Sequence, residues 1–313
     1  MLTSLPLLNS VASPTRTWRR RLLWGLVVLV LGWLVSSLLV TAALTRRVRT
    51  RSPESLAELA AFHPRDLVLN TSDGQELGAW QIPGAANQPC AVVLHGQGSR
   101  RSQRTQTIQW LAARRVTVLA VTHRAHGDSS GQTNDFGWSN RLDVIASVEH
   151  LEHEFPGRPI VILGQSLGAA SAIFAAKELD QRVEGYFLEH PFKDLDSAVW
   201  CRLNSKLPSG ADYLAYAGMR LWAPCFLPVP IGAISPVERI GDIPASVPVH
   251  IVTGRDDRHA RLADVEAVFR PVTTHGQLTI FEGAGHVDLH RSSPKEYEAA
   301  LAEFLVDVER LRQ

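Results

Sequence analysis

A serine between two glycines lies at a predicted strand-to-helix boundary near the middle of the chain. The motif GQSLG spans residues 164–168, between the apolar run at 160–163 and an alanine-rich segment that continues to residue 179. In such a context the glycines allow close packing around a sharp turn, and the serine hydroxyl is held out over the strand ends at the start of a helix. The spacing therefore predicts Ser166 as a nucleophile for acyl transfer.

A serine hydroxyl is a weak nucleophile, so this prediction requires a general base and an acid that orients the base. The predicted strand 250–253 is followed by GRDD, which places Asp257 three residues beyond a glycine and leaves Asp256 as the alternative acid. The predicted strand 277–281 is followed by EGAGH, which ends at His286. Loops that follow parallel strands emerge at one edge of a sheet, and we therefore expect the acid and the base to meet the serine.

Acyl transfer also requires hydrogen-bond donors for the negative charge that develops on the carbonyl oxygen. One expected donor is the backbone N–H of Leu167, directly after the serine. The second is the backbone N–H of Gln97, in the sequence HGQG that follows the predicted strand 90–94. An ordinary glycine-rich turn is the alternative interpretation of this sequence, and His95 is interpreted as a hydrogen-bonding support of the loop.

Short apolar strands alternate with helical segments over residues 65–313. This alternation predicts an α/β domain with a mostly parallel central sheet that helices cover on both faces. An early hairpin is expected at 66–69 and 77–81. Residues 192–235 interrupt the alternation with aromatic residues and prolines, and predict a small helical cap over the strand ends; a pair of ordinary packing helices is the alternative. The other expected elements are strands at 116–121 and 183–189 and helices at 105–114, 142–155, 168–179 and from Pro294 onward.

Residues 75–310 resemble the α/β-hydrolase-fold serine hydrolases, in the branch that includes membrane-anchored abhydrolase-domain lipases and serine aminopeptidase-like hydrolases. The resemblance rests on the four motifs HGQG, GQSLG, GRDD and GAGH, and on the loop HRAHGDSSG at 123–131. In that loop Ala125 stands where the family usually has glycine. The resemblance implies an α/β-hydrolase fold and hydrolysis through an acyl-enzyme without a cofactor.

The N-terminal region differs from the rest, because residues 1–51 contain eight Arg and no acidic residue. Residues 22–44 carry no charge, and as a helix they are long enough to cross a hydrocarbon core of about 30 Å. The pattern predicts a basic segment at 1–21, a transmembrane helix at 22–44 and a linker at 45–64. A cleaved signal peptide is the alternative, although the apolar run exceeds the usual length. Four Arg lie on each side of the span, and the position of the anchor favours an extracytoplasmic body.

The composition excludes several other classes of protein. The 313 residues are 45% hydrophobic and 20% charged, which is globular composition, and the formal net charge of +1 gives no basic field for nucleic acid. The three cysteines have no zinc-binding spacing, and pairing of Cys201 with Cys225 stays open. No metal site is predicted, because His123 and His126 lack a third ligand in the sequence. One further group is interpreted as a solvated charge run, with contact to an anionic headgroup as the alternative: Arg100, Arg101 and Arg104.

These features together predict a membrane-anchored serine hydrolase of the carboxylesterase or lipase type, acting on a small-molecule or lipid acyl substrate. A peptidase or an acyltransferase that uses the same residues is the alternative enzyme. A non-catalytic membrane scaffold of the same fold is the alternative from another class of protein. The oligomeric state and the acyl length of the substrate stay open at this point.

Overall fold

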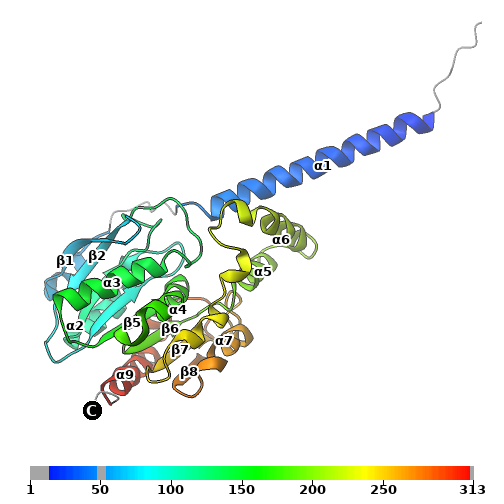
Figure 1. Ribbon diagram of the computed structural model, residues 1–313. Coiled ribbons are helices and arrows are strands. Elements are labelled where there is room, and N and C mark those ends of the chain that lie inside the picture. The colour runs from blue at the N-terminus through cyan, green and yellow to red at the C-terminus, as the bar shows by residue number, and fades with distance from the viewer. Residues whose placement is uncertain (1–13, 48–53, 311–313) are drawn as a thin grey trace, which may run out of the picture.

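The computed structural model describes residues 14–47 and 54–310, and Figure 1 shows a body built on one twisted sheet, from which a long N-terminal helix projects. The sheet has eight strands in the order β1-β2-β4-β3-β5-β6-β7-β8. Their bounds are β1 Arg65–Asn70, β2 Glu76–Ile82, β3 Cys90–Leu94, β4 Thr117–Val121, β5 Ile160–Gln165, β6 Gly185–Glu189, β7 Val249–Gly254 and β8 Gly276–Phe281. Strand β2 runs antiparallel to β1 and β4, and the other neighbouring pairs are parallel. The predicted hairpin and the mostly parallel sheet are confirmed.

Helices cover both faces of this sheet, as expected for parallel strands that are buried on both sides. Their bounds are α2 Thr105–Ala113, α3 Arg141–Glu154, α4 Leu167–Leu179, α7 Leu262–Phe269, α8 Leu289–Ser292 and α9 Pro294–Arg310. Helices α3, α4 and α7 contribute to one buried apolar cluster, whereas α2 and α9 contribute to the other. The two clusters take alternate residues of β3, so Val92 belongs to the first and Val93 to the second.

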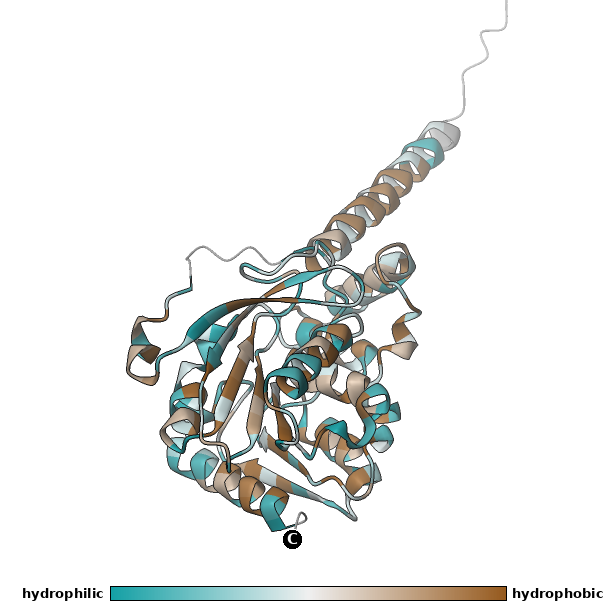
Figure 2. Cartoon of the chain, turned by 60° about the vertical axis from the view of Figure 1, so that its left-hand side comes forward, coloured by the Kyte–Doolittle hydropathy of each residue, from teal (hydrophilic) through white to brown (hydrophobic). Residues whose placement is uncertain are grey.

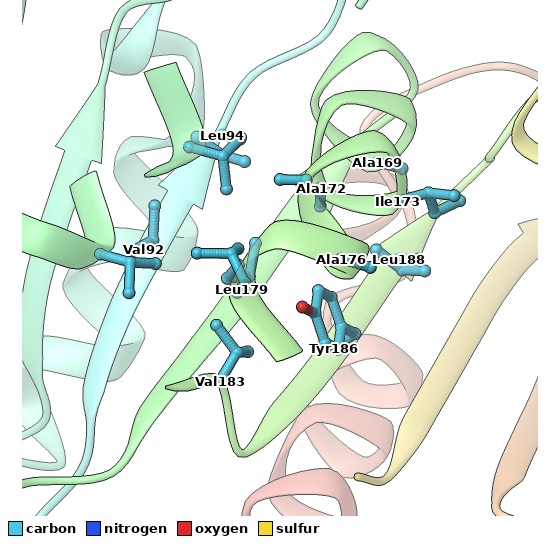
Figure 3. Close-up of a cluster of buried hydrophobic side chains, with 14 of the residues drawn as sticks. Val92, Leu94, Ala169, Ala172, Ile173, Ala176, Leu179, Val183, Tyr186 and Leu188 are labelled. Carbon is cyan, nitrogen blue, oxygen red and sulfur yellow. The ribbon is translucent and has the colours of Figure 1, made fainter. Parts of the chain in front are cut away.

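The core beneath α4 explains why this helix is so rich in alanine. Tyr186 and Leu188 of β6 lie against Ala172 and Ala176 of α4 in Figure 3, and all four are fully buried. Small side chains allow the helix to approach the sheet closely, and Gly164 and Gly168 extend this close approach to the first turn. The helix start is therefore fixed directly over the end of β5.

The strand register brings the sequence motifs to one edge of the sheet. In the parallel ladder Leu94 of β3 pairs with Gly164 of β5, and on the other side of β5 Gln165 pairs with Glu189. The next connections leave β7 and β8 at Gly254 and Phe281, which are also register partners. The loops that follow these strands therefore all leave the sheet at the same edge.

A helical excursion lies between β6 and β7, within the predicted range 192–235. It contains α5 (Leu195–Asn204) and α6 (Ala211–Trp222), followed by short 3-10 turns. A separate apolar cluster, which includes Phe174 of α4 and Leu195 of α5, joins this excursion to the body. We refer to residues 192–235 as the cap. Its two cysteines are free, with Cys201 buried and Cys225 exposed.

The N-terminal helix α1 (Pro14–Leu44) begins before the expected span and ends with it. The helical segment 17–44 contains an apolar stretch long enough to cross a membrane, and its side chains are largely exposed; Leu29, for example, is 72% exposed. Figure 2 shows the apolar middle of this helix and a hydrophilic outer end. Of the other predicted N-terminal segments, residues 1–13 and 48–53 lie outside the described part of the chain. Leu59, in the short 3-10 helix Ala57–Phe62, is fully buried against the body.

The inner turns of α1 pack against the cap. The indole N–H of Trp33 donates to the carbonyl of Leu214 (3.0 Å), and that of Trp222 donates to the carbonyl of Leu34 (3.1 Å). A Cβ at Gly218 of α6 would lie 2.4 Å from the Cβ of Ser37, so only glycine permits this approach. The chain continues beyond the helix into the body, where Arg47 donates to the carbonyls of the 123–131 loop. Helix α1 is therefore fastened to the cap and to the body.

Candidate active site

Ser166 occupies a strained turn between β5 and α4. Its φ is 50° and its ψ is −103°, a conformation that L-residues rarely adopt. A Cβ at Gly164 would lie 2.6 Å from the backbone of Gly168, and one at Gly168 would lie 2.7 Å from the side chain of Leu94. The amide of Ser166 donates to the carbonyl of Glu189 (2.7 Å), which fixes the turn to the end of β6. This geometry accounts for both glycines of the motif.

The structure brings Ser166, His286 and Asp257 into one hydrogen-bonded chain. His286 Nε2 lies 3.2 Å from Ser166 Oγ, and His286 Nδ1 lies 2.7 Å from Asp257 Oδ2. The other oxygen of Asp257 accepts hydrogen bonds from the amides of His259 (2.7 Å) and Ala260 (2.9 Å). Of the two alternative acids, Asp257 is buried at the histidine, whereas Asp256 is exposed. The arrangement places an acceptor nitrogen beside the serine hydroxyl.

A second histidine shares the same carboxylate, and the sequence analysis did not identify it. His190 follows β6 directly, and its Nδ1 lies 3.0 Å from Asp257 Oδ2. Its Nε2 lies 3.0 Å from the carbonyl oxygen of Val287. Nδ1 also lies 3.3 Å from the hydroxyl of Thr253, but each ring nitrogen has a closer oxygen that can only accept, which fits a doubly protonated imidazolium. A search for polar residues directly after every strand end would have found it.

The pKa values of this group follow from burial and from its charges. Burial alone would raise the pKa of Asp257, but the hydrogen bonds from His190 and His286 outweigh it and hold the pKa well below its usual range. Burial opposes the charged form of His190, but Asp257 and the nearby Glu189 outweigh it and raise the pKa of His190. The buried carboxylate and the buried imidazolium therefore stabilise each other's charged state.

The interpretation of the arginines after the HGQG loop as a solvated charge run was wrong for two of the three. Arg104 is 2% exposed and donates to Glu189 Oε2 and to the hydroxyl of Tyr297, both at 2.9 Å. Arg101 is equally buried, and its guanidinium bonds to both oxygens of Asp128. Asp128 lies 27 residues from Arg101 in the chain, and Glu189 lies 85 residues from Arg104, so local sequence gives no sign of this pairing.

Glu189 connects the arginine network to the turn and loop that carry Ser166 and His286. Its Oε1 accepts hydrogen bonds from the side chain of Gln165 and from the amide of Leu289, both at 2.9 Å. Arg104 also lies 3.0 Å from Asp288, which is next to Leu289 in the loop that carries His286. One buried ion-pair network thus joins the serine turn to the histidine loop.

The two predicted backbone donors lie beside the serine. Leu167 begins α4, and Gln97 lines the same cavity as Ser166. Among the described residues, no acceptor is bonded to the amide of either residue. Two hydrogen bonds hold the loop that carries Gln97 against the 123–131 loop. His95 Nε2 accepts from the amide of His123 (3.0 Å), and His126 Nε2 accepts from the amide of Gly98 (3.2 Å). These two amides are available to a ligand.

A cavity of about 230 Å³ opens above the serine. Its walls come from the HGQG loop, the serine turn, the histidine loop and the cap helix α5. Its lining includes Gln97, Ser166, Arg202, His286, Asp288 and Arg291. The cavity is therefore bounded on one side by the strand ends and on the other by the cap.

The histidines and the aspartate could in principle hold a metal ion, because ligand atoms of His190, Asp257 and His286 lie within 4.8 Å of one another. Ligand atoms around a tetrahedral zinc ion are about 3.4 Å apart at ordinary bond lengths. The distance of 2.7 Å between His286 Nδ1 and Asp257 Oδ2 is too short for that geometry and fits a hydrogen bond. These residues do not fit a metal centre.

Comparisons with known proteins show which proteins this chain is similar to. The model of the alpha/beta hydrolase family matches residues 91–300. Human monoglyceride lipase is 27% identical over 285 residues, which cover 78% of this chain and 89% of that protein. An uncharacterised protein of Mycobacterium tuberculosis is 25% identical and covers 80% of this chain and 82% of its own. A solved esterase of Pyrococcus furiosus has a TM-score of 0.68 at 23% identity, over 83% of this chain and 97% of that one, and shares the fold.

Proposed function

Because the chain belongs to the alpha/beta hydrolase family and is a carboxylesterase/lipase-like hydrolase, we propose that it cleaves carboxylic esters through a covalent acyl-enzyme on Ser166. The observation that carries this proposal is the hydrogen-bonded chain from Ser166 through His286 to Asp257, at 3.2 and 2.7 Å. The similarity to monoglyceride lipase extends the proposal to acyl esters of lipids. The serine, its base and its acid are all present, which argues against a non-catalytic scaffold.

In the proposed reaction Ser166 Oγ attacks the ester carbonyl while His286 Nε2 accepts its proton. The carbonyl oxygen becomes an oxyanion, which the backbone N–H groups of Gln97 and Leu167 stabilise. The bond to the alcohol then breaks, and the alcohol leaves with the proton from His286. A water molecule, deprotonated by His286, hydrolyses the acyl-enzyme and regenerates the serine. Asp257 keeps the imidazole in the required tautomer and orientation.

The direct test is replacement of the nucleophile. Ser166→Ala should abolish labelling by a fluorophosphonate probe and lower turnover of a p-nitrophenyl ester by about three orders of magnitude or more. Ser171→Ala is the matched control, because Ser171 lies one turn later on the same helix and bonds only to the carbonyl of Leu167. Retained labelling in Ser166→Ala would contradict the proposal.

We also propose that α1 is a retained membrane anchor. Its 31 residues extend about 46 Å at 1.5 Å per residue, which exceeds a hydrocarbon core of about 30 Å. Ser37, Thr41 and Thr45 are buried against the cap and the body, so the inner turns belong to the folded unit. Cleavage at the small residues 41–43 would remove part of this packing, which favours an anchor over a signal peptide. Alkaline carbonate should leave the full-length chain in the membrane fraction.

The docking of α1 on the cap supports a position of the cap at the bilayer. Tyr213 and Leu214 of α6 are 63% and 60% exposed beside Trp33, about 16 Å from the inner end of the helix at 1.5 Å per residue. In Figure 1, α6 lies next to the inner part of α1. We propose that α6 lies in the membrane interface, with the body on the extracytoplasmic side. A reporter fused to the C-terminus that is active in the cytoplasm would contradict that orientation.

A further inference from the structure

The cavity above Ser166 contains an arginine that has no acidic partner. Arg202 lies near the end of α5 and is partly buried. Among the described residues, no carboxylate lies within ion-pair distance of its guanidinium and no hydrogen-bond acceptor is bonded to it. The three arginines that are fully buried among the described residues, Arg101, Arg104 and Arg124, are each bonded to carboxylates.

The carboxylates around Arg202 are already engaged. Asp257 accepts hydrogen bonds from both histidines and from two amides. Asp288 also lines the cavity, but its carboxylate pairs with Arg104 and accepts from the amide of Arg291. Burial lowers the pKa of Arg202, and the negative charge of Asp257 only partly offsets this. Desolvation of a cation without a close counter-charge is unfavourable, so an anion that entered the cavity would be bound.

A second arginine, which belongs to the body and not to the cap, also lines this cavity. Arg291 belongs to α8, directly after the loop that carries His286, and is exposed. Its side chain has no ion pair with a described residue, because only its amide is bonded to Asp288. Guanidinium groups bind carboxylates and phosphates through paired N–H donors. The two arginines thus bracket the space next to the serine, one from the cap and one from the body.

We propose that Arg202 and Arg291 form an anion subsite, and that the enzyme prefers esters that carry a phosphate or a carboxylate close to the scissile carbonyl. This inference rests on the proposed ester hydrolysis at Ser166 and adds the charge of the substrate. The anion takes the place that a carboxylate occupies beside each of the other buried arginines. A neutral ester leaves Arg202 desolvated and unpaired in the complex.

The test compares three esters that share an octanoyl chain. These are 1-octanoylglycerol, which is neutral, 1-octanoylglycerol 3-phosphate and 3-octanoylglycerate, which carries a carboxylate. The full-length enzyme in detergent should hydrolyse at least one anionic ester with a higher kcat/KM than the neutral ester. The better of the two anionic esters identifies the chemistry of the anion. Equal or lower kcat/KM for both anionic esters would overturn the proposal.

Substitutions of Arg202 test whether this residue causes the preference for anionic esters. In Arg202→Met the ratio of anionic to neutral kcat/KM should fall by about 10- to 100-fold, because a charge-assisted bidentate contact is lost. Arg202→Lys should retain part of the ratio. Arg270→Met is the matched control, since Arg270 is exposed and lies before β8, at the other end of the strands. An unchanged ratio in Arg202→Met would overturn the assignment.

Two further measurements keep the result interpretable. Fluorophosphonate labelling of Ser166 reports on the proposed nucleophile and not on the anion subsite. If the unmodified enzyme is not labelled, the nucleophile assignment fails; if it is labelled but shows no preference for anionic esters, only the anion subsite fails. Glycerol 3-phosphate, the alcohol product of the phosphate ester, should inhibit hydrolysis of the neutral ester competitively in the unmodified enzyme, whereas glycerol should not. Equal inhibition by the two would contradict the subsite without the use of any variant.

Discussion

Two regions of different construction meet at the cavity above Ser166. At the sheet edge, Asp257 and Glu189 are buried, and each is held by several hydrogen bonds and by an opposite charge. In the cap, Arg202 has no described carboxylate partner and Leu214 is 60% exposed. The charges of the sheet edge are compensated within the protein, whereas the cap presents charge and apolar surface to its surroundings.

This difference separates the two tasks that an ester hydrolase must perform. Acyl transfer needs groups that are in position before the substrate arrives, and fully bonded charges at strand ends provide such preorganisation. Selection of a substrate needs groups that gain a partner only on binding. We therefore assign the reaction to the sheet edge, and the choice of substrate and the contact with lipid to the cap.

The largest expected effect concerns the acid at the sheet edge. Asp257→Asn should lower kcat by about 10⁴-fold, because an amide that donates to His286 stabilises the wrong tautomer of the base. Steady-state turnover of a p-nitrophenyl ester measures this loss. Asp256→Asn is the matched control, since the exposed Asp256 precedes Asp257 in the same loop, and its turnover should stay within a few-fold of the unmodified enzyme. Equal losses in the two variants would contradict the assignment of the acid.

The next effect contrasts a paired arginine with an unpaired one. Arg104→Met leaves Glu189 buried without its main counter-charge, and should lower the free energy of unfolding by about 3–5 kcal/mol. Arg202→Met removes a cation that is not ion-paired with a described residue, so no carboxylate loses its counter-charge. The free energy of unfolding should therefore stay the same or rise. Urea unfolding of the two variants in detergent, followed by circular dichroism, compares them. Similar destabilisation of both would show that the two regions do not differ as described.

A smaller effect concerns the charge on His190. The pKa of His190 is raised above its unfolded value of about 6.5. The stability that its protonated form contributes is therefore fully present below that pH and is lost as the pH rises through the folded pKa. His190→Gln should lower the free energy of unfolding by about 2 kcal/mol at pH below about 6, and by less at higher pH. His153→Gln, at an exposed position, should show no such trend.

Much of the sheet edge could be predicted from the sequence, because short motifs of adjacent residues determine its turns and loops. The elbow motif determines the turn at Ser166, and buried strands followed by short loops place Asp257 and His286 at the same edge. Strand β3, for example, occupies exactly the expected residues 90–94. What local patterns could not reveal is pairing between distant positions, such as Arg104 with Glu189 or His190 with Asp257. These contacts depend on the order of strands in the sheet. That order brings together residues that are far apart in the chain, and local sequence patterns do not determine it.

The cap was predicted only as a region. Its aromatic and proline residues mark an interruption of the strand–helix alternation, but they do not determine which helix face points to the cavity. Neither the position of Arg202 nor the packing of Trp33 against α6 has a sequence signal of its own. The helices α7 and α8 were also missed, because both are short, with eight and four residues.

The smallest expected effect tests whether the cap depends on the anchor. Gly218→Val places a side chain where the Cβ alone would meet Ser37 at 2.4 Å, and should weaken the packing of α1 on α6 by about 1 kcal/mol. Amide hydrogen exchange in α6 should then accelerate by about fivefold, because opening becomes more frequent. Gly32→Ala is the control, since a Cβ there meets nothing within 4 Å. Unchanged exchange in Gly218→Val would mean that the cap is held by the body alone, and that the anchor positions the enzyme without shaping its entrance.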